Sequence, residues 1–552
     1  MSGVLAGFGL LVAAIGAAGA ILLPAGRLRS LAMLTGLVLF PLLILGDQWH
    51  THQIADLRDD PMRLTFLAAL AIGASGALGY VFRRWPTLLP LATVAALPFR
   101  IPLHAGGDTA NLLVPLYLVI SGGVVATLLP GGGAVGGPTP EDASATAGGG
   151  GSPAATGPAG PATWVPRLLA AAVVLYALQA LYSEDFSKGL QNACFFFVPF
   201  SLVYGLLRDV SWDRKLLVSA MWVIGIEAVC FVLVGTVEWA ARSLFWNDQV
   251  IRSNEFHTYF RVNSVFWDPN VYGRYLALVA VVAMSALLWA RERRTLALLT
   301  GLIAVLWIGL VPTFSQSSYA ALLGGLVVLA ALRWSLKWTA IAAVGGVVVT
   351  ILIVTLAGSF SFDRINIDTS GRANLVSGGV HLFSQRPVYG YGSGSFPKAY
   401  RQHVKTRKAP VSISHTEPAT IAAEQGLVGL ALYVGLVVTA LWTMASGMGG
   451  LRPAGPVAVG DPPPPAVAEA SSGVGPPTAP PAGGAPHSDD NAPARFVART
   501  AVLAVFVALL VHTMAYAGFF EDPITWVLLA AGASLAAAPQ RSLATCRDTS
   551  AA

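Results

Sequence analysis

The feature that most constrains this chain is a series of apolar segments, each about 20 residues long, joined by short polar connections. A segment of about 20 apolar residues can cross a bilayer as a helix, because a helix satisfies its own backbone hydrogen bonds. Only 11% of the 552 residues are charged, against about 25% in an ordinary soluble domain. Together with a mean hydropathy of +0.65, this predicts an all-α polytopic membrane protein.

Fifteen segments fit this description, and the Lys and Arg residues of the short connections concentrate on every second connection. Short cytoplasmic loops are enriched in these residues, which places the N-terminus outside and the C-terminus in the cytoplasm, in an inner or plasma membrane. The first segment lacks the basic start of a signal peptide, so it counts as a helix. The predicted helices lie at about 3–23, 30–47, 63–82, 86–103, 109–129, 166–184, 189–208, 216–240, 270–290, 295–313, 316–332, 337–357, 417–445, 497–517 and 523–538.

Two connections, at 130–164 and 446–496, consist mostly of Gly, Pro, Ala and Ser. Such tracts cannot bury a core, so we predict disordered cytoplasmic linkers that act as spacers or, alternatively, dock a partner. They divide the chain into an N-terminal five-helix region at 1–129, a membrane core at 165–445, and a C-terminal helix pair with its tail at 497–552.

Two long outer connections, at 241–269 and 358–417, hold eleven Lys and Arg residues between them. The second is the large extracytoplasmic loop between the twelfth and thirteenth helices. Long loops escape the charge rule for topology, so their charges are available for chemistry. Because binding residues concentrate in loops carried by a rigid scaffold, these loops are the predicted location of a site.

Each outer loop contains a short sequence pattern that predicts its local structure. In the first, Arg261 precedes "DPN", a helix start with Asp268 as the cap and Pro269 in the first turn. In the second, "GYGSGS" lacks the Gly-Lys-Ser/Thr of a phosphate loop, so we expect its glycines to permit tight turns.

The second loop ends in "ISHTEPATIAAEQGLVG", where a polar stretch becomes a membrane helix. We expect His415 to lie at the membrane edge and Glu417 to cap the helix beside a proline. An ionisable group costs about 2.5 to 3.5 kcal/mol at a helix centre, so Glu424 should face protein or a cavity. It then either orients His415 or an arginine, or holds helices together. His512, near the outer end of its helix, is placed to line the same cavity.

Three motifs, "RVNSVFWDPNVYG", "DTSGRANLVSGGVHLFSQRPVYGYGSGSF" and "SHTEPATIAAEQGLVG", occur in this order on the predicted outer side. In these motifs the chain resembles the O-antigen ligase and O-antigen polymerase superfamily, over roughly 250–529. The N-terminal five helices match no family in this way. Two positions depart from the family pattern: Thr416 follows the histidine where Asn is frequent, and Gln316 follows Ser315 where Arg is frequent.

The resemblance implies a membrane glycosyltransferase of the GT-C type. Such an enzyme takes a glycan from an undecaprenyl-diphosphate carrier and joins it to an acceptor hydroxyl, on a glycan or a lipid. The resemblance assigns Arg261 and Arg372 to the diphosphate and His415 to the acceptor.

Elementary chemistry agrees with these roles. A sugar diphosphate needs cations at the departing phosphates and a base at the incoming hydroxyl. The planar guanidinium of arginine can donate two hydrogen bonds to a phosphate at once. A histidine with a pKa near 6.5 accepts a proton at neutral pH. We expect no metal ion, no cofactor and no nucleic acid partner. The predicted catalytic residues are His415 and Glu424, the predicted diphosphate ligands are Arg261 and Arg372, and the secondary candidates are Arg274, Arg386, Glu417 and His512.

Three alternatives stay open. A polymerase of the same superfamily would use the same donor and a different acceptor. A transporter of lipid-linked oligosaccharides would concentrate polar groups and broken helices at the bilayer midplane. A dolichol-type mannosyltransferase would place its catalytic acid in an early outer loop, where this chain has Asp56, Asp59 and Asp60.

Overall fold

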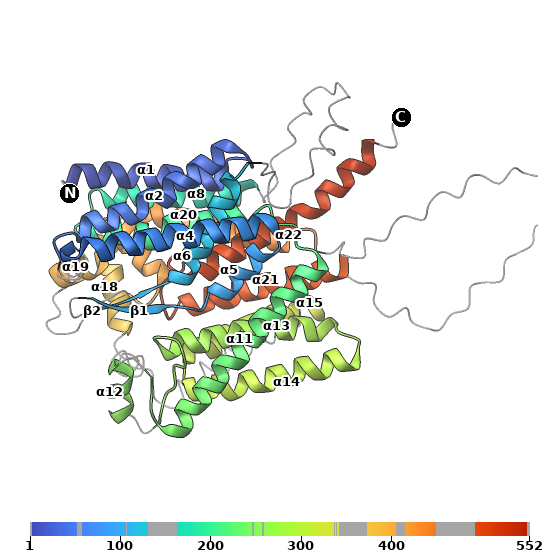
Figure 1. Cartoon of the computed structure of the whole chain (residues 1–552). Helices are drawn as coiled ribbons and strands as arrows, with labels where there is room; N and C mark the ends of the chain where they lie inside the picture. The colour runs from blue at the N-terminus through green and yellow to red at the C-terminus, as the bar shows by residue number, and fades with distance from the viewer. Residues whose placement is uncertain are drawn as a thin grey trace, which may run out of the picture.

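Most of the predicted apolar segments form helices in the computed structural model (Figure 1). The structure describes residues 3–51, 58–105, 108–130, 163–245, 248–256, 259–335, 337, 339, 341, 372–404, 414–448 and 492–548. Its elements are α1 (Gly3–Leu22), α2 (Arg27–Gln48), α4 (Pro61–Arg84), α5 (Leu88–Ala96), β1 (Ile101–Ala105), β2 (Asp108–Leu112), α6 (Val114–Leu128), α8 (Trp164–Ala180), α9 (Phe186–Asn192), the π-helix η3 (Ala193–Phe197), α10 (Val198–Leu207), α11 (Arg214–Ala241), α12 (Asp248–Phe256), α13 (Pro269–Trp289), α14 (Arg293–Leu310), the 3-10 helix η4 (Val311–Thr313), α15 (Gln316–Arg333), α18 (Arg372–Gln385), α19 (Phe396–His403), α20 (Glu417–Ala445), α21 (Ala492–Thr513) and α22 (Pro523–Asp548).

Within the described residues, ten helical segments are long and apolar enough to cross a membrane, which confirms a polytopic membrane protein. Three shorter apolar helices, at 114–128, 164–180 and 523–537, accompany them. The predicted helix at 337–357 and both predicted linkers lie almost wholly outside the described residues. The number of fifteen helices therefore stays a prediction.

The predicted helix at 86–103 is wrong as a single helix. Only the nine-residue α5 forms, and its C-cap is Leu97, directly before Pro98. The residue before a proline is disfavoured in helical geometry, and the proline has no N–H to continue the ladder. The chain continues as β1, which pairs antiparallel with β2 in the register Ile101↔Leu112, so the chain is not purely helical.

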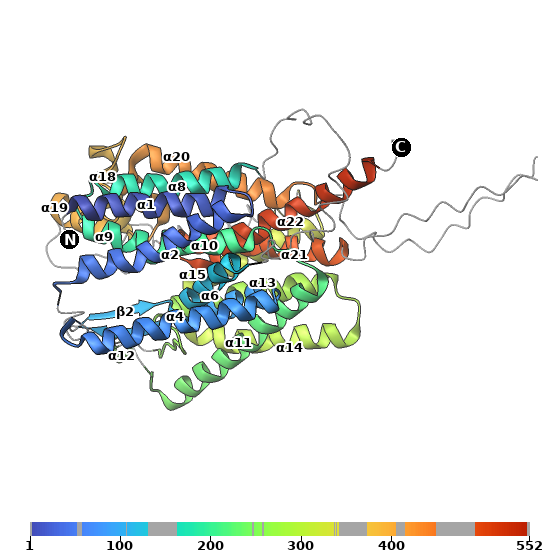
Figure 2. The same cartoon turned by 45° about the horizontal axis from the view of Figure 1, so that its top comes forward.

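The helices run side by side, and the two ends of the bundle differ (Figures 1 and 2). The N-terminus lies at the end that carries the β1–β2 hairpin, α12, α18 and α19, and the C-terminal end of α22 lies at the opposite end. At that opposite end Arg29, in the first turn of α2, pairs with Asp209 after α10. The described parts of the two long connections that were predicted to lie outside thus share one end, as expected, and two of the arginine-rich connections share the other.

Helix α20 is broken at Gly426, whose φ is +66°. The segment after α18 fills the break with backbone hydrogen bonds: Gly392 N–H donates to Glu424 O (2.8 Å), and Leu427 N–H donates to Pro387 O (2.7 Å). Gly390 also has a positive φ, +68°, and a Cβ there would overlap the Glu424 backbone. The expectation that these glycines permit tight turns is confirmed, because only glycine adopts this conformation without strain.

Three buried contacts set the position of the connection between α21 and α22. Arg274 of α13 forms an ion pair with Asp522 at 2.8 Å, and both side chains are less than a tenth exposed. The Phe520 ring stacks on Phe197, and the Trp526 indole N–H donates to the Phe520 carbonyl. Because this connection is fixed from α13 and η3, the residues along it have defined places beside α20.

Candidate functional site

Three predicted residues converge at the end of the bundle that carries α18 and α19. Arg261 precedes α13, Arg372 is the first residue of α18, and His415 lies two residues before α20. The charge of Arg372 reaches both of the others: after burial, it is a further cause of the lowered pKa of Arg261 and of His415. Asp268 acts in the opposite direction on both pKa values. Residues from three separate segments of the sequence, one of them more than a hundred residues before the other two, therefore form one electrostatic cluster.

Arg261 is held in place from several directions. Its Nε donates to the Thr313 carbonyl at 2.9 Å and its Nη2 to the Asn270 side chain at 3.2 Å. The Asn254 side chain bonds both the N–H and the carbonyl of Arg261, at 3.0 and 2.9 Å. A guanidinium has five N–H donors, and these described contacts use two of them. The side chain is thus positioned while it keeps donors for an anionic ligand.

Asp268 has the predicted role of a helix cap. Its carboxylate accepts from Asn270 N–H at 2.6 Å, and Pro269 is the first residue of α13. The helix start orders the chain that carries Arg261.

His415 occupies a strained turn. Its φ is +62°, and the Nδ1 atom is buried with no hydrogen-bond partner among the described residues. The Ser414 hydroxyl bonds Thr416 N–H at 3.2 Å, and the Thr416 hydroxyl donates to the Met514 carbonyl at 3.0 Å. A non-glycine residue in this conformation costs of order 1 to 3 kcal/mol and persists only when its surroundings impose it. Burial lowers the pKa of His415, so the ring is neutral at pH 7.

Glu424 does not contact His415 or an arginine in the described part of the chain. Its two oxygens accept the backbone N–H groups of Gly394 (2.8 Å) and Phe396 (2.9 Å). Of the two expectations for Glu424, that of holding structural elements together fits these contacts. The carboxylate anchors the glycine loop against α20.

The prediction that Glu417 caps its own helix is wrong. Thr416 occupies the cap position, and α20 begins at Glu417 itself. The Glu417 carboxylate instead accepts the N–H groups of Gly518 (2.7 Å) and Phe519 (3.1 Å), in the connection before α22. The sequence does not reveal this partner, because it lies 101 residues away.

The other secondary candidates have protein partners. Arg274 forms the ion pair with Asp522 described above. His512 Nε2 lies 3.2 Å from the Ser317 hydroxyl, and its ring lies 5.6 Å from that of Tyr516. Arg386 pairs with Glu184 at 3.3 Å and stacks over the Tyr391 ring. Tyr516 links His512 to the cluster, because the Tyr516 ring also lies 6.3 Å from the His415 ring.

A polar cavity of about 390 Å³ lies at the start of α20; Glu424 lines it, as one of its two expected surroundings, whereas His512, which was expected to line the same cavity, is not among its lining residues. Two buried carboxylates, those of Glu417 and Glu424, line it with the half-buried carboxylate of Glu521 and with Lys188. Asn192 donates to Glu521 at 3.2 Å. Burial raises the pKa of Glu521. Glu521 was not among the predicted site residues, and its signal in the sequence is the acidic pair in "FFEDPITW", between two apolar segments.

The acids of the alternative mannosyltransferase site have structural roles where they are described. Asp60 caps α4 by accepting from Arg63 N–H at 3.0 Å, and the exposed Asp59 pairs with Arg58 at 3.2 Å. Asp56 lies outside the described residues. These contacts give no arrangement for glycan transfer.

Residues 301–434 match the family model described as O-antigen ligase. This range contains Arg372, His415 and Glu424, while Arg261 lies before it. A comparison with curated proteins finds no match.

Proposed function

We propose that this chain, which belongs to the O-antigen ligase and polymerase superfamily, transfers a glycan from an undecaprenyl-diphosphate carrier to an acceptor hydroxyl. The observation that carries the proposal is the cluster of Arg261, Arg372 and a neutral His415 at one end of a membrane bundle. Two cations and one base are what transfer from a diphosphate requires. The reaction takes place on the extracytoplasmic face of the cell membrane, in the synthesis of a cell-surface polysaccharide, and the C-terminus is cytoplasmic.

In this mechanism each residue has one task. Arg261 and Arg372 bind the diphosphate and stabilise the charge that develops as the bond from the anomeric carbon to the phosphate oxygen breaks. His415 accepts the proton of the acceptor hydroxyl while the new bond from oxygen to the anomeric carbon forms. The carrier diphosphate leaves. The arginines supply the positive charge, so the proposed transfer proceeds without a metal ion.

We assign the glycan end of a substrate to the polar cavity at the start of α20. Sugar hydroxyls both donate and accept hydrogen bonds, and the cavity offers carboxylate acceptors, the Asn192 amide and the Lys188 ammonium. Glu417 and Glu424 are fixed by backbone N–H groups, so their oxygens are pre-positioned. Glu424 is thereby a positioning residue.

The polymerase is the second candidate, since it would use the same donor and the same three residues. The acceptor separates the two activities: a ligase joins the glycan to a terminal acceptor such as lipid A-core, and a polymerase joins it to another carrier-linked repeat. A transporter is disfavoured, because the break in α20 is filled by the chain's own loop rather than left open as a pathway.

Donor binding tests the proposal directly. Arg372→Lys keeps the charge but loses the two-pronged contact, so we expect about tenfold weaker binding of the carrier-linked glycan to the purified protein. The matched control is Arg386→Lys, at the other end of α18, where the arginine pairs with Glu184. Glycan transfer by the unmodified protein is measured separately, with and without a chelator. Unchanged affinity in Arg372→Lys, or loss of transfer with the chelator, contradicts the proposal.

The pH dependence of transfer provides a second prediction. A base works when deprotonated, so activity is lost as the pH falls through the pKa of His415, which burial and then Arg372 hold below the usual 6.5. At saturating donor, Arg372→Gln removes a cause of the lowering and should move this acid limb to higher pH. Asp268→Asn removes a charge that raises the pKa and should move the limb to lower pH, while Asn can still cap α13. Shifts in the same direction for both variants argue against His415 as the titrating base.

A further inference from the structure

Tyr516 lies near both His415 and His512, in the connection between α21 and α22. Its ring centroid is 6.3 Å from that of His415 and 5.6 Å from that of His512. The connection begins with a tight turn, in which the His512 carbonyl accepts the N–H groups of Ala515 and Tyr516, both at 3.0 Å. The turn places an aromatic hydroxyl side chain beside the histidine that serves as the base in the proposed transfer.

Hydrogen bonds on both sides of Tyr516 tie its segment to the start of α20. Before it, the Met514 carbonyl accepts from the Thr416 hydroxyl at 3.0 Å. After it, the Glu417 carboxylate accepts the two backbone N–H groups described above. Because Thr416 and Glu417 directly follow His415, these bonds hold Tyr516 and His415 in a fixed relation.

The Tyr516 hydroxyl is available to a ligand. The side chain is half-buried, and within the described part of the chain no residue forms a hydrogen bond with this hydroxyl. Its oxygen is not among the fully buried polar atoms that lack a partner, so it keeps a surface that a ligand can reach. Burial raises the pKa of the hydroxyl, so it is protonated at pH 7 and can donate a hydrogen bond.

The charges around this hydroxyl favour a phosphate. The described groups whose charges act on its pKa are Asp268, Arg274, Arg100 and Arg372. Arg274 is neutralised by its ion pair with Asp522, which leaves two arginines and one aspartate. Arg372 and Asp268 are also the charges that act on the pKa of Arg261, which adds a third cation to the cluster. The hydroxyl thus lies among described charges in which cations outnumber anions.

The residues that follow Tyr516 form part of the wall of the polar cavity at the start of α20. Ala517 and Gly518 line this cavity, to which we assigned the glycan end of a substrate. Tyr516 therefore lies where the cavity meets the cation cluster. In a carrier-linked glycan, the group at this junction is the phosphate that is bonded to the anomeric carbon.

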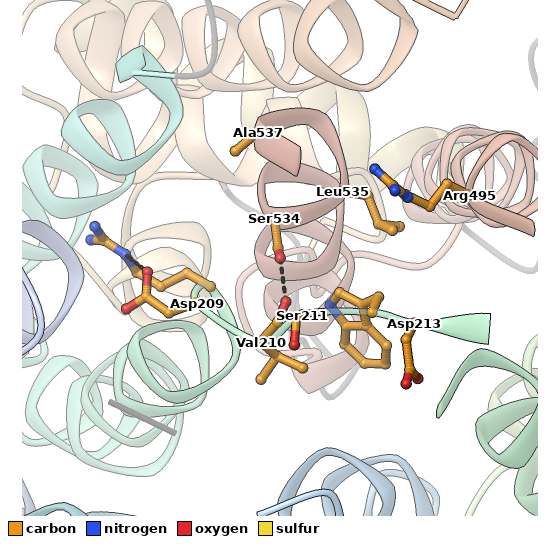
Figure 3. Close-up of a pocket in the computed structure, with 10 residues that line it drawn as sticks. Asp209, Val210, Ser211, Asp213, Arg495, Ser534, Leu535 and Ala537 are labelled. Carbon is orange, nitrogen blue, oxygen red and sulfur yellow. Dashed lines mark hydrogen bonds and ion pairs between the residues drawn. The ribbon is translucent and has the colours of Figure 1, made fainter. Parts of the chain in front are cut away.

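The polar pocket at the opposite end of the bundle has a balanced charge (Figure 3). Its volume is about 260 Å³, and its charged lining residues are Arg208, Arg495, Asp209 and Asp213. Figure 3 shows the hydrogen bond from the Ser534 hydroxyl to the Val210 carbonyl, 2.6 Å long, beside these groups. Two cations are matched by two anions among the described lining residues, so this pocket does not favour a phosphate.

We propose that the Tyr516 hydroxyl donates a hydrogen bond to the phosphate that is bonded to the anomeric carbon of the donor. This inference rests on the proposed function and adds a neutral hydrogen-bond donor to its two arginines. The proton stays on Tyr516, and the hydrogen bond strengthens as the phosphate oxygen gains charge while its bond to the anomeric carbon breaks. Tyr516 then acts on the leaving group, whereas His415 acts on the acceptor.

The test removes the hydroxyl and keeps the ring. Tyr516→Phe in the purified full chain should weaken the binding of the carrier-linked glycan about tenfold, as expected for a lost hydrogen bond to a charged group. Undecaprenyl diphosphate without a sugar should lose affinity by the same factor, because the phosphates are common to both ligands. The control is Tyr389→Phe, in the connection after α18, where the side chain is 66% exposed, and it should change neither affinity.

Two further measurements separate a ligand contact from a structural role. The temperature of thermal unfolding should stay the same in Tyr516→Phe, because the hydroxyl has no described protein partner. The acid limb of glycan transfer should also stay at the same pH, because a neutral phenol adds no charge beside His415. A lower unfolding temperature, a shifted acid limb, or a loss of affinity for the sugar-bearing ligand alone would overturn the proposal.

The outcomes also distinguish this inference from the proposed function. An unmodified protein that neither binds nor transfers the carrier-linked glycan contradicts the proposed function itself. If the unmodified protein does both, and Tyr516→Phe binds the two ligands with unchanged affinity, then only the role of Tyr516 is wrong.

Discussion

Replacing His415 with Ala should reduce glycan transfer by about 100-fold or more while donor binding stays nearly unchanged. The base removes a proton from the acceptor, whereas Arg261 and Arg372 hold the donor, so the two functions separate. Purified protein with carrier-linked glycan allows binding and a single turnover to be measured independently.

The control is His403→Ala, at the end of α19, where the ring lies 3.3 Å from Glu184. It should leave transfer within about a factor of two, in keeping with a surface contact. A His415→Ala protein that transfers at the normal rate would show that another group takes the proton. Because the φ of His415 is +62°, His415→Asn, a residue that tolerates this conformation, is a second variant that separates loss of the base from loss of the turn.

Gly390→Ala should unfold the glycine loop and abolish transfer. The φ of +68° costs an alanine about 1 to 2 kcal/mol, and its Cβ would overlap the backbone of Glu424, adding about 1 to 3 kcal/mol. Glu424 accepts two N–H groups from this loop, so its displacement also alters the wall of the polar cavity. Thermal unfolding of the purified protein and the transfer rate report the two consequences.

Gly301→Ala serves as the matched control. Gly301 lies inside α14, and a Cβ there meets nothing within 4 Å, so alanine should keep activity and stabilise the helix slightly. Gly426→Ala probes the opposite side of the same contact, because its Cβ would overlap the Val388 backbone. Gly390→Ala protein with normal stability and normal transfer would mean that the loop does not set the geometry of the site.

The sequence by itself determined the class of the protein and the place to look for its site. The length of an apolar segment is a local property, so it predicted most of the helices without knowledge of any neighbouring helix. The positions of Lys and Arg, which are also local, predicted the orientation. The start of α13 was readable for the same reason, because Asp268 bonds an N–H two residues away. The prediction of one helix at 86–103 was wrong, because it rested on hydropathy alone. Pro98 disfavours helical geometry at Leu97, so the helix ends there although the segment is apolar.

Only the tertiary structure decided which polar groups act together. Glu417 bonds Gly518, Arg274 pairs with Asp522, and Glu424 bonds Gly394, each across a gap in sequence that no periodicity spans. A buried charge takes whichever partner the packing of helices brings to it, since leaving it unpaired costs several kcal/mol. The sequence could therefore name ionisable residues at the end of the bundle that carries α18 and α19. Which of them anchor the fold and which face a substrate depends on contacts that exist only after the helices pack.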